Sequence, residues 1–309
     1  MEDIKEIRYK DYTAKINLSR GANCIELKNS KYNASVLRVP DYSRKLDNPY
    51  LYGMPILFPV NRISGGKFIF EDREYDFGIN EENTGCFLHG IIHDTPFSIK
   101  EHKENKIVCE LSKNPYPGFP HEFSITMEYE LNEEGFSHKT SITNLSDENM
   151  PAFLGFHTTF NINVFNSDNA DNVKVLAEVS KEYERNMKNY LPTGNEPEFD
   201  LVSKELNSGR FKPITKPISR HYRAQTGGVM KITDESKNLS VVYENDEKFG
   251  FRLIYCGGTE GYICLEPQNV LANCANSLIP RDEAGFFYIE PKKTEIFNSK
   301  IYIREEIKK

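Results

Sequence analysis

The stretch PAFLGFHTTFN at residues 151–161 decides the fold prediction for this chain. It is an apolar run rich in aromatic and β-branched residues, which is typical of a β-strand. Side chains two residues apart on a strand share a face, so Gly155 removes bulk on the face that carries His157. We therefore expect a packed strand that presents His157 to a cavity. The alternative is a histidine whose hydrogen bonds are satisfied within the core.

Short alternating segments with turn residues between them continue on both sides of this stretch. The clearest are residues 106–111, 123–131 and 136–143, and strand character returns from residue 228 to residue 303. Residues 181–188 are polar enough for a loop or a short helix, and prolines exclude a long helix between residues 166 and 224. The pattern predicts an all-β fold with two large packed sheets. We expect residues 1–309 to form one domain, since two halves would each expose half a sandwich.

Composition excludes several classes of protein. The chain has 309 residues and a formal net charge of -7, which argues against general nucleic-acid binding and suits a neutral substrate. The first ten residues are charged, unlike a signal peptide, and no stretch approaches the ~20 apolar residues of a membrane helix. Six cysteines are scattered without a CxxC pair, so we expect free thiols in a cytoplasmic protein.

Polar residues at the ends of apolar runs are the candidates for chemistry. Asn61 and Arg62 follow the run at residues 55–60, and Arg62 could donate two hydrogen bonds to a ligand or form an ion pair at a strand end. His89 lies in a Leu-His-Gly turn, where it could be a donor or a structural residue. Glu266 ends the apolar run 262–265 before a proline, as Glu290 does after another aromatic strand. Local pattern alone does not separate these two carboxylates.

Four motifs in this order resemble the aldose 1-epimerase (galactose mutarotase) family. They are LFPVNRI at residues 57–63, CFLHG at 86–90, the stretch 151–161 and ICLEPQN at 263–269. The resemblance covers nearly the whole chain and implies a β-supersandwich of mostly antiparallel sheets that interconverts the anomers of a hexose. It implies that His157 is the acid and Glu266 the base. It also implies that Asn61, Arg62 and His89 bind the sugar.

Opening a sugar hemiacetal requires one group that takes the proton of the anomeric hydroxyl and another that protonates the ring oxygen. We expect this acid and base on opposite edges of one pyranose, each with a pKa near the working pH. Neither a metal nor an organic cofactor is needed. A metal site built on His89 and His93 would lack a third ligand nearby.

One region departs from the family. Well-studied members grip sugar hydroxyls with an aspartate, whereas residues 218–223 read ISRHYR and contain no acid. Ser219 or His221 is the candidate replacement, and we expect His221 to bind substrate. The basic residues Arg220, His221 and Arg223 would suit an anionic or phosphorylated sugar.

The leading hypothesis is an isomerase of the aldose 1-epimerase type, a monomer or homodimer with a small sugar as substrate and neither nucleic acid nor membrane as partner. The alternatives are a hexose-phosphate epimerase of the same fold and a non-catalytic protein that senses a sugar in the same cleft.

Overall fold

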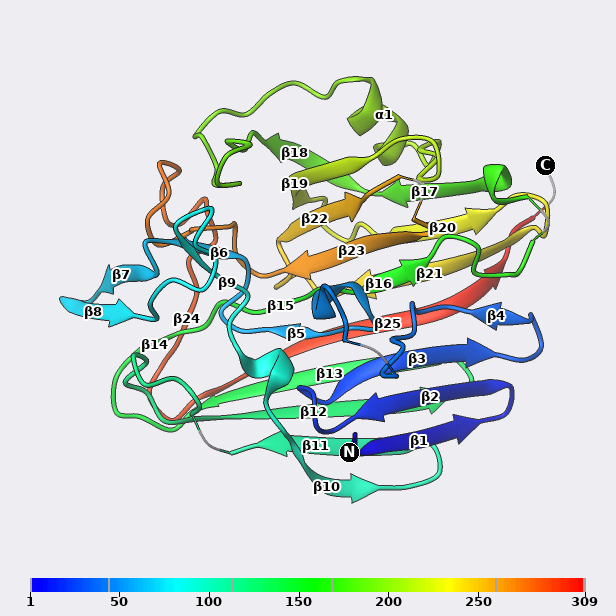
Figure 1. Cartoon of the computed structure of the whole chain (residues 1–309). Helices are drawn as coiled ribbons and strands as arrows, with labels where there is room; N and C mark the ends of the chain where they lie inside the picture. The colour runs from blue at the N-terminus through cyan, green and yellow to red at the C-terminus, as the bar shows by residue number, and fades with distance from the viewer. Residues whose placement is uncertain (1, 44, 113, 168, 259, 308–309) are drawn as a thin grey trace.

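A computed structural model describes residues 2–43, 45–112, 114–167, 169–258 and 260–307. Two large antiparallel β-sheets lie across the molecule (Figure 1). The larger sheet has eight strands, in the spatial order β10 (Ser98–His102), β11 (Lys106–Leu111), β12 (Phe123–Asn132), β13 (Gly135–Asn144), β25 (Thr294–Glu305), β21 (Leu239–Asn245), β20 (Met230–Asp234) and β17 (Val173–Ala177).

The second large sheet has seven strands and contains most of the predicted motifs. Its order is β18 (Val179–Tyr183), β19 (Ile218–Ala224), β22 (Phe251–Cys256), β23 (Tyr262–Gln268), β15 (Gly155–Phe156) and β5 (Ile56–Leu57), with β16 (Thr159–Asn161) pairing β23 after β15. The predicted all-β fold with two large sheets is confirmed.

Smaller sheets and short helices complete the described structure. A four-stranded sheet contains β1 (Ile4–Tyr9), β2 (Tyr12–Asn17), β3 (Asn23–Asn29) and β4 (Ala34–Ser35). Two-stranded pairs are β6 (Arg62–Ser64) with β9 (Cys86–Leu88), β7 (Lys67–Phe70) with β8 (Arg73–Asp76), and β14 (Met150–Pro151) with β24 (Tyr288–Ile289). The α-helix is α1 (Leu201–Asn207), and 3-10 turns are η1 (Pro49–Leu51), η2 (Ile92–Asp94) and η3 (Ala170–Asn172).

The expected loop or helix at residues 181–188 is wrong in its first part. Strand β18 runs through Tyr183 and pairs with β19 in the register Tyr183 to His221. Glu182 and Tyr183 are buried there, so tertiary packing overrides the polar local sequence.

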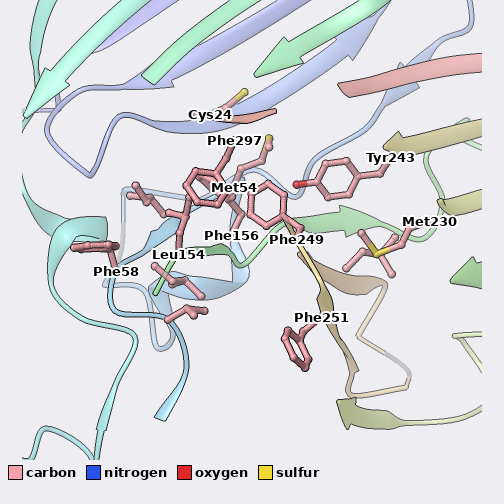
Figure 2. Close-up of a cluster of buried hydrophobic side chains, with 14 of the residues drawn as sticks. Cys24, Met54, Phe58, Leu154, Phe156, Met230, Tyr243, Phe249, Phe251 and Phe297 are labelled. Atoms are coloured by element: carbon pink, nitrogen blue, oxygen red, sulfur yellow. The ribbon is translucent and has the colours of Figure 1, made fainter. Parts of the chain in front are cut away.

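Aromatic side chains connect the two large sheets. Phe156 of β15 lies 4.6 Å from the ring of His138 in β13, and Phe160 of β16 lies 5.6 Å from Tyr243 in β21. Figure 2 shows Phe156 beside Phe249 in this core, with Tyr243 pointing toward them. Since Phe156 faces the core, its neighbour His157 projects to the other face of the seven-stranded sheet.

All six cysteines are buried and free, as expected from their scattered positions. Among the described residues, no helix has both the length and the apolar character needed to span a bilayer.

Candidate active site

Strand register brings His157 and Glu266 together. Gly155 pairs with Gln268, and Thr159 pairs with Cys264. The four-residue step from Gly155 to Thr159 thus matches the four-residue step from Gln268 back to Cys264, so the register does not shift between β15 and β16. His157 therefore lies directly opposite Glu266, although the two residues are far apart in the sequence. Directly opposed side chains of antiparallel strands share a face and lie close together, which makes this contact a consequence of the sheet.

A proline interrupts the ladder at this point. The backbone N–H of Leu265 donates to Thr158, and that of Asn269 donates to Leu154. The donor between them would be residue 267, but Pro267 has no N–H. The gap between β15 and β16 follows from this missing bond. The expectation that Glu266 ends its strand is wrong, because β23 continues through Pro267 to Gln268.

The two functional groups are in contact within a nearly dry environment. Nε2 of His157 lies 3.3 Å from Oε1 of Glu266, and the residues are 7% and 0% exposed. Burial lowers the pKa of His157 to about 3 and raises the pKa of Glu266 to about 8. We expected the groups on opposite edges of a pyranose, but they lie side by side. This arrangement still suits ring opening, since the anomeric oxygen and the ring oxygen are bonded to the same carbon.

A chain of hydrogen bonds extends from Glu266 to the Leu-His-Gly turn. Gln268 donates to Glu266 at 3.2 Å and accepts from the side chain of Asn61 at 3.1 Å. The backbone N–H of Asn61 donates to Nδ1 of His89, and the N–H of His89 donates to the carbonyl of Asn61. Asn61 and His89 both have φ near +60°, a conformation in which a residue with a side chain is strained. Reciprocal bonding between the two turns holds them there.

Tyr50 is a neighbour that the sequence did not reveal. Its ring lies 4.8 Å from His89, 6.0 Å from His157 and 4.6 Å from His93. His93 also lines a cleft of about 340 Å³, which neither His157 nor Glu266 lines. Tyr50 therefore lies in contact with three imidazoles, one of which lines the cleft.

Arg62 lies beside the site and is already paired. Its Nε and Nη2 donate to the two carboxylate oxygens of Glu81 at 2.6 and 2.7 Å, in the two-pronged geometry typical of arginine. Its guanidinium also lies 4.6 Å from the ring of Tyr190. Arg62 therefore forms an ion pair at a strand end next to the site, and its predicted contact with a ligand stays a prediction.

The basic residues of β19 do not form the anion site that their charges suggested. Arg220 pairs with Asp200 and Glu182, and Arg223 bonds to the backbone of Glu283. His221 is fully buried, and neither ring nitrogen has a hydrogen-bond partner. It lies in the same cross-strand row as Glu266, since His221 pairs with Leu253 and Leu253 pairs with Glu266.

Three buried side chains could bind a metal together. Donor atoms of His157, Cys264 and Glu266 lie within 4.8 Å of one another, and imidazole, thiolate and carboxylate are ligands that Zn²⁺ accepts. His93 and His89 do not belong to this group, so the metal site considered from their spacing has no support.

Burial separates the two glutamates that the sequence left equivalent. Glu290 is exposed, whereas Glu266 is enclosed beside an imidazole.

Gly155 is also required at this site, because a Cβ at this position would lie 2.5 Å from Val60 and 3.1 Å from Gln268.

A family model described as aldose 1-epimerase matches residues 6–295. The chain belongs to this family.

Solved structures of related proteins extend over the whole chain. A galactose mutarotase-like protein from Clostridium acetobutylicum is 30% identical, with 98% of this chain and 99% of that chain covered and a TM-score of 0.89. An aldose epimerase homologue from C. elegans has 15% identity, coverage of 99% and 100%, and a TM-score of 0.77. A galactose 1-epimerase from Lactobacillus acidophilus has 13% identity, coverage of 99% and 100%, and a TM-score of 0.71. The last two show the fold alone.

Among curated relatives, an uncharacterized Escherichia coli protein, YihR, is 25% identical over 159 residues, which are 51% of this chain and 50% of that protein. The chain therefore spans about half the length of the curated relative it matches.

Asn269 holds the two strands of this aldose 1-epimerase family site together. Its side chain accepts from the N–H of Leu154 at 2.7 Å and donates to the carbonyl of Ala152 at 2.8 Å. Asn269→Ala leaves both buried backbone groups unpaired, so we expect a loss of about 3 kcal/mol in unfolding free energy. Urea denaturation measures this loss of unfolding free energy. Asn276→Ala is the control, because Asn276 is exposed and its side chain donates one hydrogen bond, to the carbonyl of Lys67. A loss below about 1 kcal/mol would contradict the role given to Asn269.

Proposed function

We propose that this protein is an aldose 1-epimerase that interconverts the α and β anomers of a hexose. His157 is the proton donor to the ring oxygen, and Glu266 is the acceptor of the anomeric hydroxyl proton. The observation that carries the proposal is the buried contact of 3.3 Å between Nε2 of His157 and Oε1 of Glu266. The reaction needs neither a metal nor an organic cofactor.

The pair supplies one transferable proton. Between about pH 3 and pH 8 the two groups together hold a single proton, because burial shifts their pKa values in opposite directions. In the form with imidazolium and carboxylate, Glu266 removes the proton of O1 while His157 protonates the ring oxygen. The bond from C1 to the ring oxygen breaks, and an aldehyde forms. After rotation about C1–C2, the reverse proton transfers close the ring on the other face and restore the pair.

Surrounding residues orient the sugar and the carboxylate. We propose that Arg62 and His89 contact sugar oxygens, that Asn61 positions the carboxylate through the glutamine beside it, and that His221 lines the same face. Tyr50 lies beside both imidazoles, where its ring could contact a bound sugar. We further propose that residues 1–309 act as one domain and that the protein works in the cytoplasm, where six buried free thiols stay reduced.

Saturation-transfer NMR between anomer signals tests this function. With a panel of hexoses and hexose phosphates, the exchange rate of at least one sugar should rise with protein concentration. As pH rises through about 8, kcat/KM should fall about tenfold for each pH unit, because the pair then loses its only proton. Binding of a sugar without faster exchange would instead identify a sensor, and exchange that is flat to pH 10 would exclude this acid–base pair.

A further inference from the structure

Arg185 is a cation near the site whose charge is not compensated. Its Nη2 donates to the carbonyl and, at 2.8 Å, to the hydroxyl of Ser219. Within the described ranges it forms no ion pair with a carboxylate, and Nε and Nη1 make no hydrogen bond to protein. Its side chain is half-buried, and burial lowers the pKa of the guanidinium to about 10. These two donors are therefore available to solvent or to a ligand.

Nearby arginines differ from Arg185 in this respect. Arg62 is neutralised by Glu81, and Arg220 is neutralised by Asp200 and Glu182. The guanidiniums of Arg62 and Arg185 lie 4.6 and 5.8 Å from the same ring, that of Tyr190. Two cations around one ring repel each other, and only one of them has a counter-ion.

Glu266 does not neutralise Arg185 in the resting protein. The pKa of Glu266 is raised to about 8, so at neutral pH this carboxyl group keeps its proton. The region around the pair and the two arginines therefore has an excess of positive charge, which an anionic ligand would balance.

Sheet register relates Ser219, the residue to which Arg185 bonds, to Glu266. Ser219 pairs with Tyr255, and Tyr255 pairs with Cys264, in the row next to that of Glu266. Ser219 and Glu266 therefore share a face and are separated by two strand spacings across the sheet and two residues along it, or about 12 Å. Because the guanidinium of Arg185 bonds to Ser219, a hexose that extends from Glu266 toward Ser219 would bring its far end to this cation.

We infer that Arg185 binds an anionic group on the end of the hexose that lies away from C1, so that the substrate is an acidic monosaccharide. The free edge of the guanidinium matches the paired oxygens of a phosphate or a carboxylate. This inference rests on the proposed epimerase function and adds the substrate class. Ser219 is a positioning residue, since its hydroxyl accepts a hydrogen bond from Arg185.

Anomer exchange of matched sugars tests the inference. Glucose, glucuronate and glucose 6-phosphate, with their galactose counterparts, separate neutral sugars from the two acidic classes. We expect kcat/KM to be at least about 10-fold higher for one acidic class than for the neutral sugar, since a charge-assisted hydrogen bond contributes about this much. Arg185→Gln should lower kcat/KM for that class by about 10- to 100-fold, mainly through KM, and Arg185→Lys should restore part of it.

Arg220→Gln is the matched control, because it removes a cation from the same region that already has carboxylate partners. It should change the preference for acidic sugars by less than about twofold. Calorimetry with 1,5-anhydroglucitol 6-phosphate, which lacks an anomeric hydroxyl, measures binding without turnover and should show the same loss in Arg185→Gln. Equal kcat/KM for neutral and acidic sugars in the wild type would overturn the inference and leave the epimerase intact. Absence of exchange for every sugar would overturn the proposed function itself.

Discussion

Glu266→Gln is expected to lower kcat for anomer exchange by at least about 100-fold, because the amide cannot take the proton of the anomeric hydroxyl. The substitution keeps the shape of the side chain, and its amide oxygen can still accept the bond from Gln268. Substrate affinity should therefore change little. Saturation-transfer rates at several sugar concentrations separate kcat from KM.

Glu290→Gln is a matched control for this experiment. Glu290 also precedes a proline after a strand, but it is exposed, whereas Glu266 is buried. This variant should keep wild-type exchange rates. His157→Asn should lose activity to a similar extent as Glu266→Gln, and the double variant should lose little more, because the two groups act as one unit. Full activity in Glu266→Gln would assign the proton acceptor to another residue.

The candidate pair was predicted from the family resemblance and not from local pattern alone, and its geometry could be predicted from neither. The apolar runs around His157 and Glu266 predicted strands, and Glu266 does lie in β23, whereas His157 lies in the break between β15 and β16. The direct contact depends on the register of β15 and β16 against β23, which one missing donor at Pro267 helps to fix. Register results from pairing across the sheet, and no local pattern encodes it.

Other neighbours were missed for reasons that differ. Gln268 could have been found, because it lies two residues from Glu266 and therefore shares its face. Tyr50 comes from a 3-10 turn, and Arg185 follows a strand that was expected to be a loop or helix. The charges of Arg220 and Arg223 suggested an anion site, but both side chains already have partners within the protein. Charge in a sequence shows neither which cations are paired nor which one is left over.

Glu266→Gln is also expected to make the protein more stable at alkaline pH. Burial raises the pKa of Glu266 to about 8 in the folded protein, against about 4.3 in an unfolded chain. Between these values the folded protein holds a proton that the unfolded chain has released, so rising pH favours unfolding. The wild type should lose about 1.4 kcal/mol of unfolding free energy per pH unit from this group alone. Glutamine does not titrate, and the variant should lack this loss.

Urea denaturation from pH 5 to pH 9 measures the effect. The difference in unfolding free energy between Glu266→Gln and wild type should grow with pH by about 4 kcal/mol and level off above pH 8. All other titrating groups are common to both proteins and cancel in this difference. Glu290→Gln, which replaces an exposed carboxyl group, is the control variant in the same series. Parallel curves for Glu266→Gln and wild type would mean that the pKa of Glu266 is the same in the folded and the unfolded protein. In that case the folded protein would not hold a proton on Glu266 at neutral pH, and the shared proton of the proposed pair would be excluded.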